Sequence, residues 1–112
     1  MSIQMLEQYL NLTSDREQLV VANMANVDTP GYHTRDIDFQ GAMRRVVNGS
    51  VSGDVTPVAL QVAGLPERPD GNNVNLDREG LMLSEVQMQY QIGVQLLKGE
   101  FHDILTAINE GK

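Results

Sequence analysis

A seven-residue repeat of large apolar side chains runs through the C-terminal part of the chain and restricts the fold more than any other feature. The repeat is unbroken at Leu76, Leu83, Tyr90, Leu97 and Ile104. Apolar residues also lie four positions after its last three members: Val94, Phe101 and Ile108. A strict repeat of seven aligns side chains along one side of a long helix that supercoils with another helix. We therefore expect a helix from residue 75 onwards, with an apolar seam for packing.

Asn75 is the expected N-cap of this helix, and Asp77 and Glu79 lie near its positive end. Three glycines fall within it: Gly80, Gly93 and Gly99. Each of them lowers helix stability by about 1 kcal/mol relative to alanine. The helix is therefore expected to depend on packing, or to have neighbours that approach closely at the glycines.

A second long helix is predicted from Ser2 to about Asn26, because seam positions there alternate in steps of four and three. These positions are Met5, Tyr9, Leu12, Arg16, Leu19, Asn23 and Asn26. The seam is impure because Arg16 is charged. Thr13-Ser14-Asp15 leaves a second option open, in which these residues cap another helix or mark a weak point.

The first helix ends in a sequence that cannot continue it. Pro30 lacks a backbone N–H and moves Thr29 out of the α region, while Gly31 accepts positive φ. Asn23 and Asn26 share one side of the last turns. Two interpretations stay open for this pair: polar groups at a helix interface that fix register, or C-terminal residues that point to solvent.

A short helix is predicted near 39–47, with Asp38 as its N-cap and Asn48-Gly49 at its end. Its apolar side consists of Phe39, Ala42, Met43, Val46 and Val47. Before it, residues 33–39 are expected to be extended. After it, Val58, Leu60 and Val62 alternate as in a short strand, and the rest of residues 50–73 is expected to be flexible.

Together these segments predict a mainly α fold with a coiled-coil-like pair of long N- and C-terminal helices, a short helix and a flexible middle that contains little β structure. We expect one domain in three parts. Residues 1–32 form the first helix and its turn, residues 33–74 the middle segment, and residues 75–112 the C-terminal heptad helix.

The composition disfavours several classes of partner and site. Acidic side chains outnumber basic ones by 15 to 8, and the net charge of −7 disfavours nucleic acid and anionic membrane surfaces. The chain has no cysteine for disulfides or thiolate metal sites. Its N-terminus lacks the features of a cleavable signal, and no segment reaches the ~20 apolar residues of a membrane span, so we expect no direct membrane insertion.

His33, Asp36 and Asp38 are the one candidate set of metal ligands. Alternation along an extended segment places His33 opposite the two aspartates, and Asp38 is better used as a helix cap. No nucleophile triad, phosphate-binding loop or paired-carboxylate motif stands out. We expect no catalysis, metal or cofactor, and a small metal-dependent enzyme built on these three residues is kept as an alternative to test.

The end of the first helix carries a specific motif. It reads Ala22-Asn23-Met24-Ala25-Asn26-Val27-Asp28-Thr29-Pro30-Gly31-Tyr32. This run resembles the A-N-x-A-N-x-x-T-P-G-Y signature of the axial proteins of the bacterial flagellum, which form its rod and hook. Within that group, Arg35-Asp36-Ile37-Asp38-Phe39 and residues 71–79 are similar to proximal rod proteins. Residues 48–70 are unmatched, and Gly80 departs from the family pattern, which tends to have methionine or another helix former there.

The resemblance implies a structural subunit of the rod in the flagellar basal body, in the periplasm. Its terminal helices would pack against copies of itself and other rod proteins in a helical tube around an export channel. It implies contact with ring-anchoring basal-body proteins and export through the flagellar type III apparatus without a cleaved signal. The implied assembly residues are Ala22, Asn23, Ala25, Asn26, Thr29, Pro30, Gly31 and Tyr32, together with the two seams.

The resemblance suggests a role for one more segment, and one alternative to the whole assignment stays open. Phe39-Gln-Gly-Ala-Met43 is similar to a segment that early export substrates present to the export gate, although Phe39 and Met43 also belong to the apolar side of the short helix. A self-contained helical hairpin, such as an adaptor or secretion chaperone, would use the same heptads within one chain or a dimer.

Overall fold

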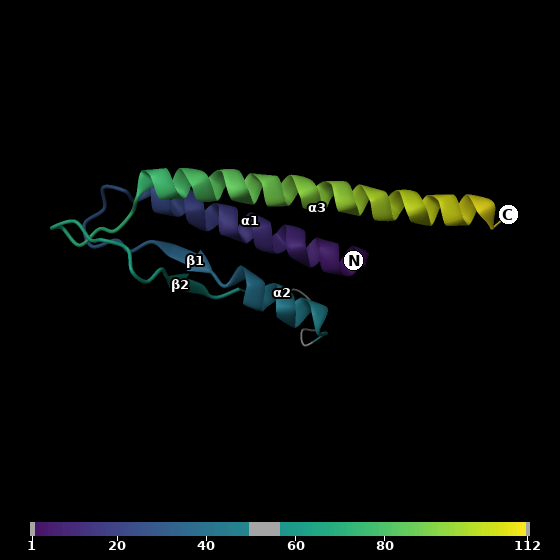
Figure 1. Ribbon diagram of the computed structural model, residues 1–112, viewed down its shortest axis with the longest axis horizontal. Helices are drawn as coiled ribbons and strands as arrows, with labels where there is room; N and C mark the ends of the chain where they lie inside the picture. Colours follow the sequence, from purple (N-terminus) through teal and green to yellow (C-terminus); the bar gives the residue numbers. More distant parts are fainter. Residues whose placement is uncertain (1, 50–56, 112) are drawn as a thin grey trace.

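Two long helices, one short helix and two short strands make up the chain in the computed structural model, which describes residues 2–49 and 57–111. In chain order they are α1 (Ile3–Ala25), β1 (Arg35–Ile37), α2 (Phe39–Val47), β2 (Ala59–Gln61) and α3 (Leu76–Glu110). The molecule is elongated, with extents of 69 × 27 × 17 Å (Figure 1). The predicted fold class, mainly α with long terminal helices and little strand, is confirmed. Within the described ranges, no helix is both long and apolar enough to cross a membrane.

α1 and α3 lie side by side and run in opposite directions (Figure 1). α3 has 35 residues and α1 has 23, so the C-terminal part of α3 continues past the start of α1. The buried residues of α3 are Glu79, Val86 and Gly93, which are spaced by seven. Each lies three positions after a member of the predicted seam. Within the chain, the contact with α1 is therefore centred on a stripe beside that seam.

α1 is a single helix, as its alternating positions predicted. The Ser2 hydroxyl accepts a hydrogen bond from the Met5 amide at 3.1 Å and caps the helix. The division at Thr13-Ser14-Asp15 that the sequence left open does not occur. Thr13 is fully buried, and its hydroxyl donates to the Leu10 carbonyl at 2.8 Å, so it bonds within the helix and starts no new one.

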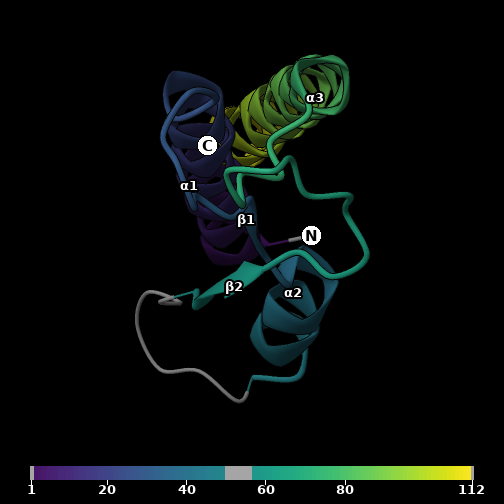
Figure 2. The ribbon, with the colours of Figure 1, turned by 90° about the vertical axis from the view of Figure 1, so that its left-hand side faces the viewer.

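The middle of the chain returns along α1, which lies between α3 and α2 (Figure 1), and Figure 2 shows α2 and α3 on different sides of α1. β1 and β2 pair antiparallel with Asp36 opposite Leu60, which confirms the predicted short strand. The Asp38 carboxylate accepts from the Gly41 amide at 3.1 Å and begins α2 as predicted. We call β1, α2 and β2 the arm. Of the segment expected to be flexible, residues 50–56 lie outside the described residues.

The arm packs on α1 through a small apolar core. Leu12, Ile37 and Ala42 are buried there, and the partly buried residues around them are Leu19, Phe39, Met43 and Val46. The ring of Phe39 meets the ring of Tyr9 edge to face, with centroids 5.6 Å apart. The apolar side that periodicity predicted for α2 is therefore the side that holds the arm in place.

Gly93 is the glycine of α3 at which the two long helices approach most closely. A β-carbon at Gly93 would lie 2.7 Å from Leu10 Cδ2 and 2.9 Å from the Tyr9 ring. At Gly80 or Gly99 it would meet no described atom within 4 Å. The expectation of close approach at a glycine is confirmed at Gly93 alone.

Gly93→Ala and Gly80→Ala form a matched pair that tests this contact. Gly80→Ala is expected to raise the free energy of unfolding by up to about 1 kcal/mol, because alanine is the better helix former. Gly93→Ala should lower it by about 1 to 3 kcal/mol, because its methyl group overlaps Tyr9 and Leu10. Urea denaturation followed by circular dichroism measures both. Equal gains for the two variants would contradict the close approach.

Candidate functional site

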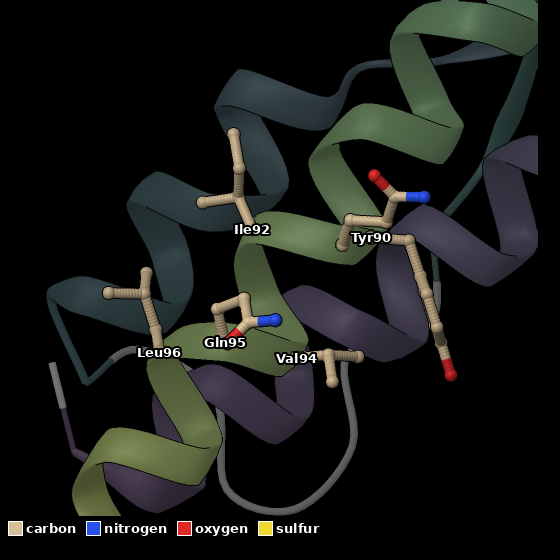
Figure 3. A pocket seen from close by; sticks show the side chains of 6 residues that line it. Tyr90, Ile92, Val94, Gln95 and Leu96 are labelled. Atoms are coloured by element: carbon tan, nitrogen blue, oxygen red, sulfur yellow. The ribbon is translucent and has the colours of Figure 1, made fainter.

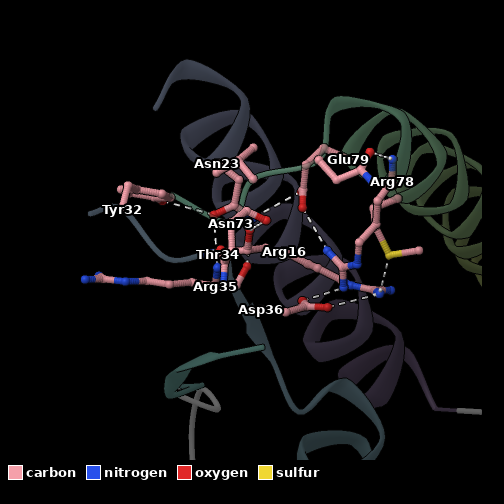
Figure 4. Close-up of polar contacts among 12 residues, drawn as sticks. Arg16, Asn23, Tyr32, Thr34, Arg35, Asp36, Asn73, Arg78 and Glu79 are labelled. Carbon is pink, nitrogen blue, oxygen red and sulfur yellow. Dashed lines mark hydrogen bonds and ion pairs between the residues drawn. The ribbon is translucent and has the colours of Figure 1, made fainter. Parts of the chain in front are cut away.

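Asn23 lies in the last turns of α1 and is 1% exposed. Its side-chain nitrogen donates to the Arg35 carbonyl at 2.8 Å and to Glu79 Oε2 at 3.1 Å. Its side-chain oxygen accepts from the Tyr32 hydroxyl at 3.0 Å and from the Arg35 amide at 3.1 Å (Figure 4). A carboxamide has two N–H donors and two acceptor lone pairs, so all of its hydrogen-bonding capacity is used. Asn23 therefore joins α1, the turn, the arm and α3 of one chain.

The two asparagines of the motif differ in their partners: Asn23 bonds residues distant in the sequence, and Asn26 bonds residues within the helix end and the turn. Asn23 is buried between helices, but its four hydrogen bonds are all made with three residues of its own chain. Asn26 ends α1: its side-chain nitrogen donates to the Ala22 carbonyl at 2.7 Å, and its side-chain oxygen accepts from the Thr29 hydroxyl at 3.0 Å. A register contact between either residue and a neighbouring copy stays a prediction, and Asn23 keeps no spare donor or acceptor for it.

The rest of the motif forms the turn itself. Gly31 has φ +75°, a left-handed conformation that favours glycine. Ala25, Thr29, Pro30 and Gly31 are exposed, whereas Ala22 and Tyr32 are half-buried. The motif therefore presents an exposed edge at the turn and a buried polar side toward its own chain.

A second pair of asparagines, Asn72 and Asn73, holds the turn from the other side. Asn72 donates from its side chain to the carbonyls of Asn26 and Thr29 at 2.9 and 2.8 Å. The Asn73 side chain accepts from the Thr34 amide at 2.6 Å. Both residues are buried. These contacts were not predicted from the sequence, and the signal that could have indicated them is a doubled asparagine just before a capped helix.

Glu79 is a fully buried carboxylate at the start of α3. Arg78 Nη1 lies 2.8 Å from Glu79 Oε1, and Asn23 bonds the other oxygen. A buried carboxylate is costly unless it is paired and hydrogen-bonded, and both conditions are met here. The expected placement near the positive end of the helix is confirmed, and the contact with Asn23 adds a fixed point between α1 and α3.

Arg16, which interrupts the predicted seam, connects three elements (Figure 4). Its Nε and Nη2 donate to the two carboxylate oxygens of Asp36 at 3.2 and 3.3 Å. Its Nη1 donates to Gln89 at 3.5 Å and lies 3.7 Å from Glu85. The bidentate ion pair with Asp36 therefore joins α1 to β1, and the contacts with Gln89 and Glu85 join α1 to α3. The Arg16 side chain is 11% exposed.

The candidate metal ligands are used separately. Asp36 pairs with Arg16, and Asp38 caps α2. His33 Nε2 lies 3.0 Å from Glu67, and its Nδ1 lies 3.3 Å from Gln61. Across residues 2–49 and 57–111, no three His, Asp or Glu side chains are grouped as metal ligands would be.

The predicted seam residues divide into covered and uncovered groups. In α1, Leu12 is buried, and Met5, Tyr9 and Leu19 are half-buried. In α3, Leu83 and Leu97 are half-buried, but the other members are exposed: Leu76, Tyr90, Phe101 and Ile104. Leu76 and Tyr90 are exposed because α1 packs beside this seam, on Glu79, Val86 and Gly93. Phe101 and Ile104 are exposed because α3 continues there past the start of α1.

The end of α3 is the largest stretch of helix without cover. Residues 101–110 are all exposed. Four large apolar side chains lie among them: Phe101, Ile104, Leu105 and Ile108. A second set of exposed apolar residues occupies another side of the same helix, and Figure 3 shows Ile92 and Leu96 projecting from it, while Tyr90 and Val94 project elsewhere. Such apolar surface on a helix indicates contact with other molecules.

The sequence is similar to curated proteins named flagellar basal body rod protein FlgB. Those of Yersinia ruckeri and Escherichia coli (strain K12) are each 30% identical to it over 94% of this chain and 91% of their own length. That of Bacillus subtilis (strain 168) is 27% identical over 99% of this chain and 95% of its own length. No family model matches the chain. The similarity spans nearly the whole chain and is not confined to the terminal helices.

Asn23→Ala tests whether the polar contacts of Asn23 hold the chain together. It should lower the free energy of unfolding by about 3 kcal/mol, because Glu79, Tyr32 and both backbone groups of Arg35 lose a partner. The control Asn26→Ala removes two local hydrogen bonds near solvent and should cost about 1 kcal/mol. Urea denaturation of the two variants gives the comparison, and equal losses would count against the central role of Asn23.

Proposed function

This chain belongs to the FlgB family of flagellar basal body rod proteins, and on that premise we propose that it is a structural subunit of the proximal rod. Copies assemble through their terminal helices into a helical tube, and the tube serves motility. In this proposal the chain holds no catalytic centre and no cofactor.

The observation that carries the proposal is the uncovered end of α3. The first part of α3 packs on α1, whereas residues 101–110 are all exposed. Phe101 is 50% exposed and Ile108 is 57% exposed. Burial of an apolar side chain of this size is worth roughly 1.5 to 3 kcal/mol, so contact with other subunits would stabilise an assembly substantially.

The exposed seam residues supply further contact surface for the same assembly. Leu76, Tyr90 and Ile104 are exposed in the single chain, although a repeat of seven places them for packing against a helix. We assign these positions to neighbouring copies and to other rod proteins. The exposed edge of the turn, from Thr29 to Gly31, lies at the opposite end of α3 and would meet a different neighbour.

Export through the flagellar type III apparatus, without a cleaved signal, and contact with ring-anchoring proteins complete the proposal. Phe39 and Met43 would be the segment that contacts the export gate. Both are partly buried against α1 in the folded chain. They would become accessible when the arm is released or the chain is unfolded, so the export and folded forms use the same two side chains differently.

The isolated chain is expected to be a monomer that proteases cut first near its C-terminus. Residues 101–110 are all exposed and so have little burial to oppose local unfolding, whereas α1 and the first part of α3 pack against each other. Limited proteolysis with mass spectrometry locates the first cuts, and light scattering gives the mass. A dilute monomer whose last ten residues resist cleavage as well as α1 does would contradict this expectation.

Ile104→Asp with Ile108→Asp tests assembly in a strain that depends on this chain. Both residues are exposed, so the folded monomer should keep its circular dichroism spectrum, but complete rods and swimming should be lost. The matched control is Thr106→Asp with Asn109→Asp, which adds the same charge on another side of the helix. Electron microscopy of basal bodies scores the result. Normal rods in the first variant, or in a strain that lacks the chain, would sink the proposal.

A further inference from the structure

The end of α3 has an apolar side and an acidic side. Phe101, Ile104, Leu105 and Ile108 form the apolar one. Glu100, Asp103 and Glu110 are spaced by three and seven, so they share a neighbouring side of the helix. Residues 100–110 contain no lysine or arginine. A partner for this surface should therefore combine apolar contacts with positive charge.

A surface with those properties lies on another part of the chain, where α1 begins and α2 ends. A groove there is lined by Met5, Val46 and Val47, together with Ser2, Gln4, Gln8 and Gly49. Val47 is 55% exposed. Arg44 lies three residues before Val47 and therefore on the same side of α2, and Arg45 follows it.

The charge of α2, which forms one wall of the groove, is complementary to that of the end of α3. α2 contains two arginines and no acidic residue, whereas residues 100–110 contain three acidic side chains. Arg44 and Arg45 are exposed, and neither has an ion pair among the described residues. In a chain with a net charge of −7, α2 is the helix with a net positive charge. It is therefore the helix to which an acidic segment is drawn.

The two surfaces lie apart within one chain, because α2 is on the other side of α1 from α3 and the end of α3 continues past the start of α1 (Figures 1 and 2). A second copy, displaced along the long axis, can bring its own α3 end to the groove. Resting on the assembly proposed above, we propose that residues 101–110 of one copy dock in the groove between α1 and α2 of the next. This contact joins unlike surfaces, so it repeats from copy to copy and does not close into a two-fold pair. In the proposed rod the repetition follows a helix.

Cysteine cross-linking tests the contact directly, because the chain has no cysteine of its own. Basal bodies are isolated from cells that produce the full chain with Val47→Cys and Ile108→Cys, and are then oxidised. The expected product is a ladder of dimers and larger oligomers. When the two single variants are co-produced as separate chains, dimers are expected, and these cannot come from a bond within one chain.

The control replaces Val47→Cys by Val58→Cys, which lies just before β2 and is 67% exposed. It presents a thiol as accessible as the one at position 47, but away from the groove. Cross-linking of position 108 to position 47 should exceed that to position 58 by about tenfold, because effective concentration is high only at a docked pair. Equal cross-linking in complete rods would overturn the docking while leaving the proposed rod function intact.

A charge exchange provides the second test. Arg44→Glu with Arg45→Glu, and separately Asp103→Arg with Glu110→Arg, should each reduce the number of complete rods about tenfold, because like charges then face each other. The fourfold variant restores opposite charges and should recover rods. Recovery cannot arise if the arginine changes merely unfold α2. Normal rods in both double variants, or no recovery in the fourfold variant, would refute the docking, whereas the isoleucine variants above test assembly itself.

Discussion

The full hydrogen bonding of one buried asparagine underlies the arrangement of the whole chain. Asn23 contacts both backbone groups of Arg35, the hydroxyl of Tyr32 and the carboxylate of Glu79. Each partner belongs to a different stretch of chain, so the direction of the arm and the position of α3 are set from one side chain. The carboxylate of Glu79 is tolerated in the interior because Asn23 and Arg78 satisfy it. Without these hydrogen bonds, the chain reversal after α1 would leave buried polar groups unpaired.

Local rules predicted most of the secondary structure. Asp38 caps α2 and Asn75 caps α3 with the expected side-chain hydrogen bonds. α1 begins after Ser2, close to the predicted start, and the Ser2 hydroxyl caps it. Periodicity alone did not predict which side of α3 faces α1, because this helix is apolar on more than one side. Two residues that are not hydrophobic determine which side of α3 contacts α1. Gly93 lets the helices approach closely because it has no side chain, and Glu79 is hydrogen-bonded to Asn23 of α1.

The sequence identified several residues of the candidate site, but it did not predict which residues they contact. The motif around Asn23 indicated a special helix end, yet the contacts of Asn72 with two carbonyls of the turn join residues more than forty positions apart in sequence. Neither periodicity nor capping preference reports such distant pairs. Arg16 gave a usable signal, because a charged residue at a seam position needs a partner; the identity of that partner, Asp36, depends on how the arm folds back.

The buried polar contacts are concentrated near the turn, and the far end of α3 has none among the described residues. Mechanically, the long helix is a cantilever: it is clamped from Glu79 to Gly93, and its tip is free beyond the start of α1. Helices bend gently with a radius of roughly 60 to 100 Å, so small curvature near the clamp displaces the tip sideways without breaking a polar contact. Identical subunits can therefore tilt their tips toward neighbours at slightly different angles while the clamped end keeps its shape.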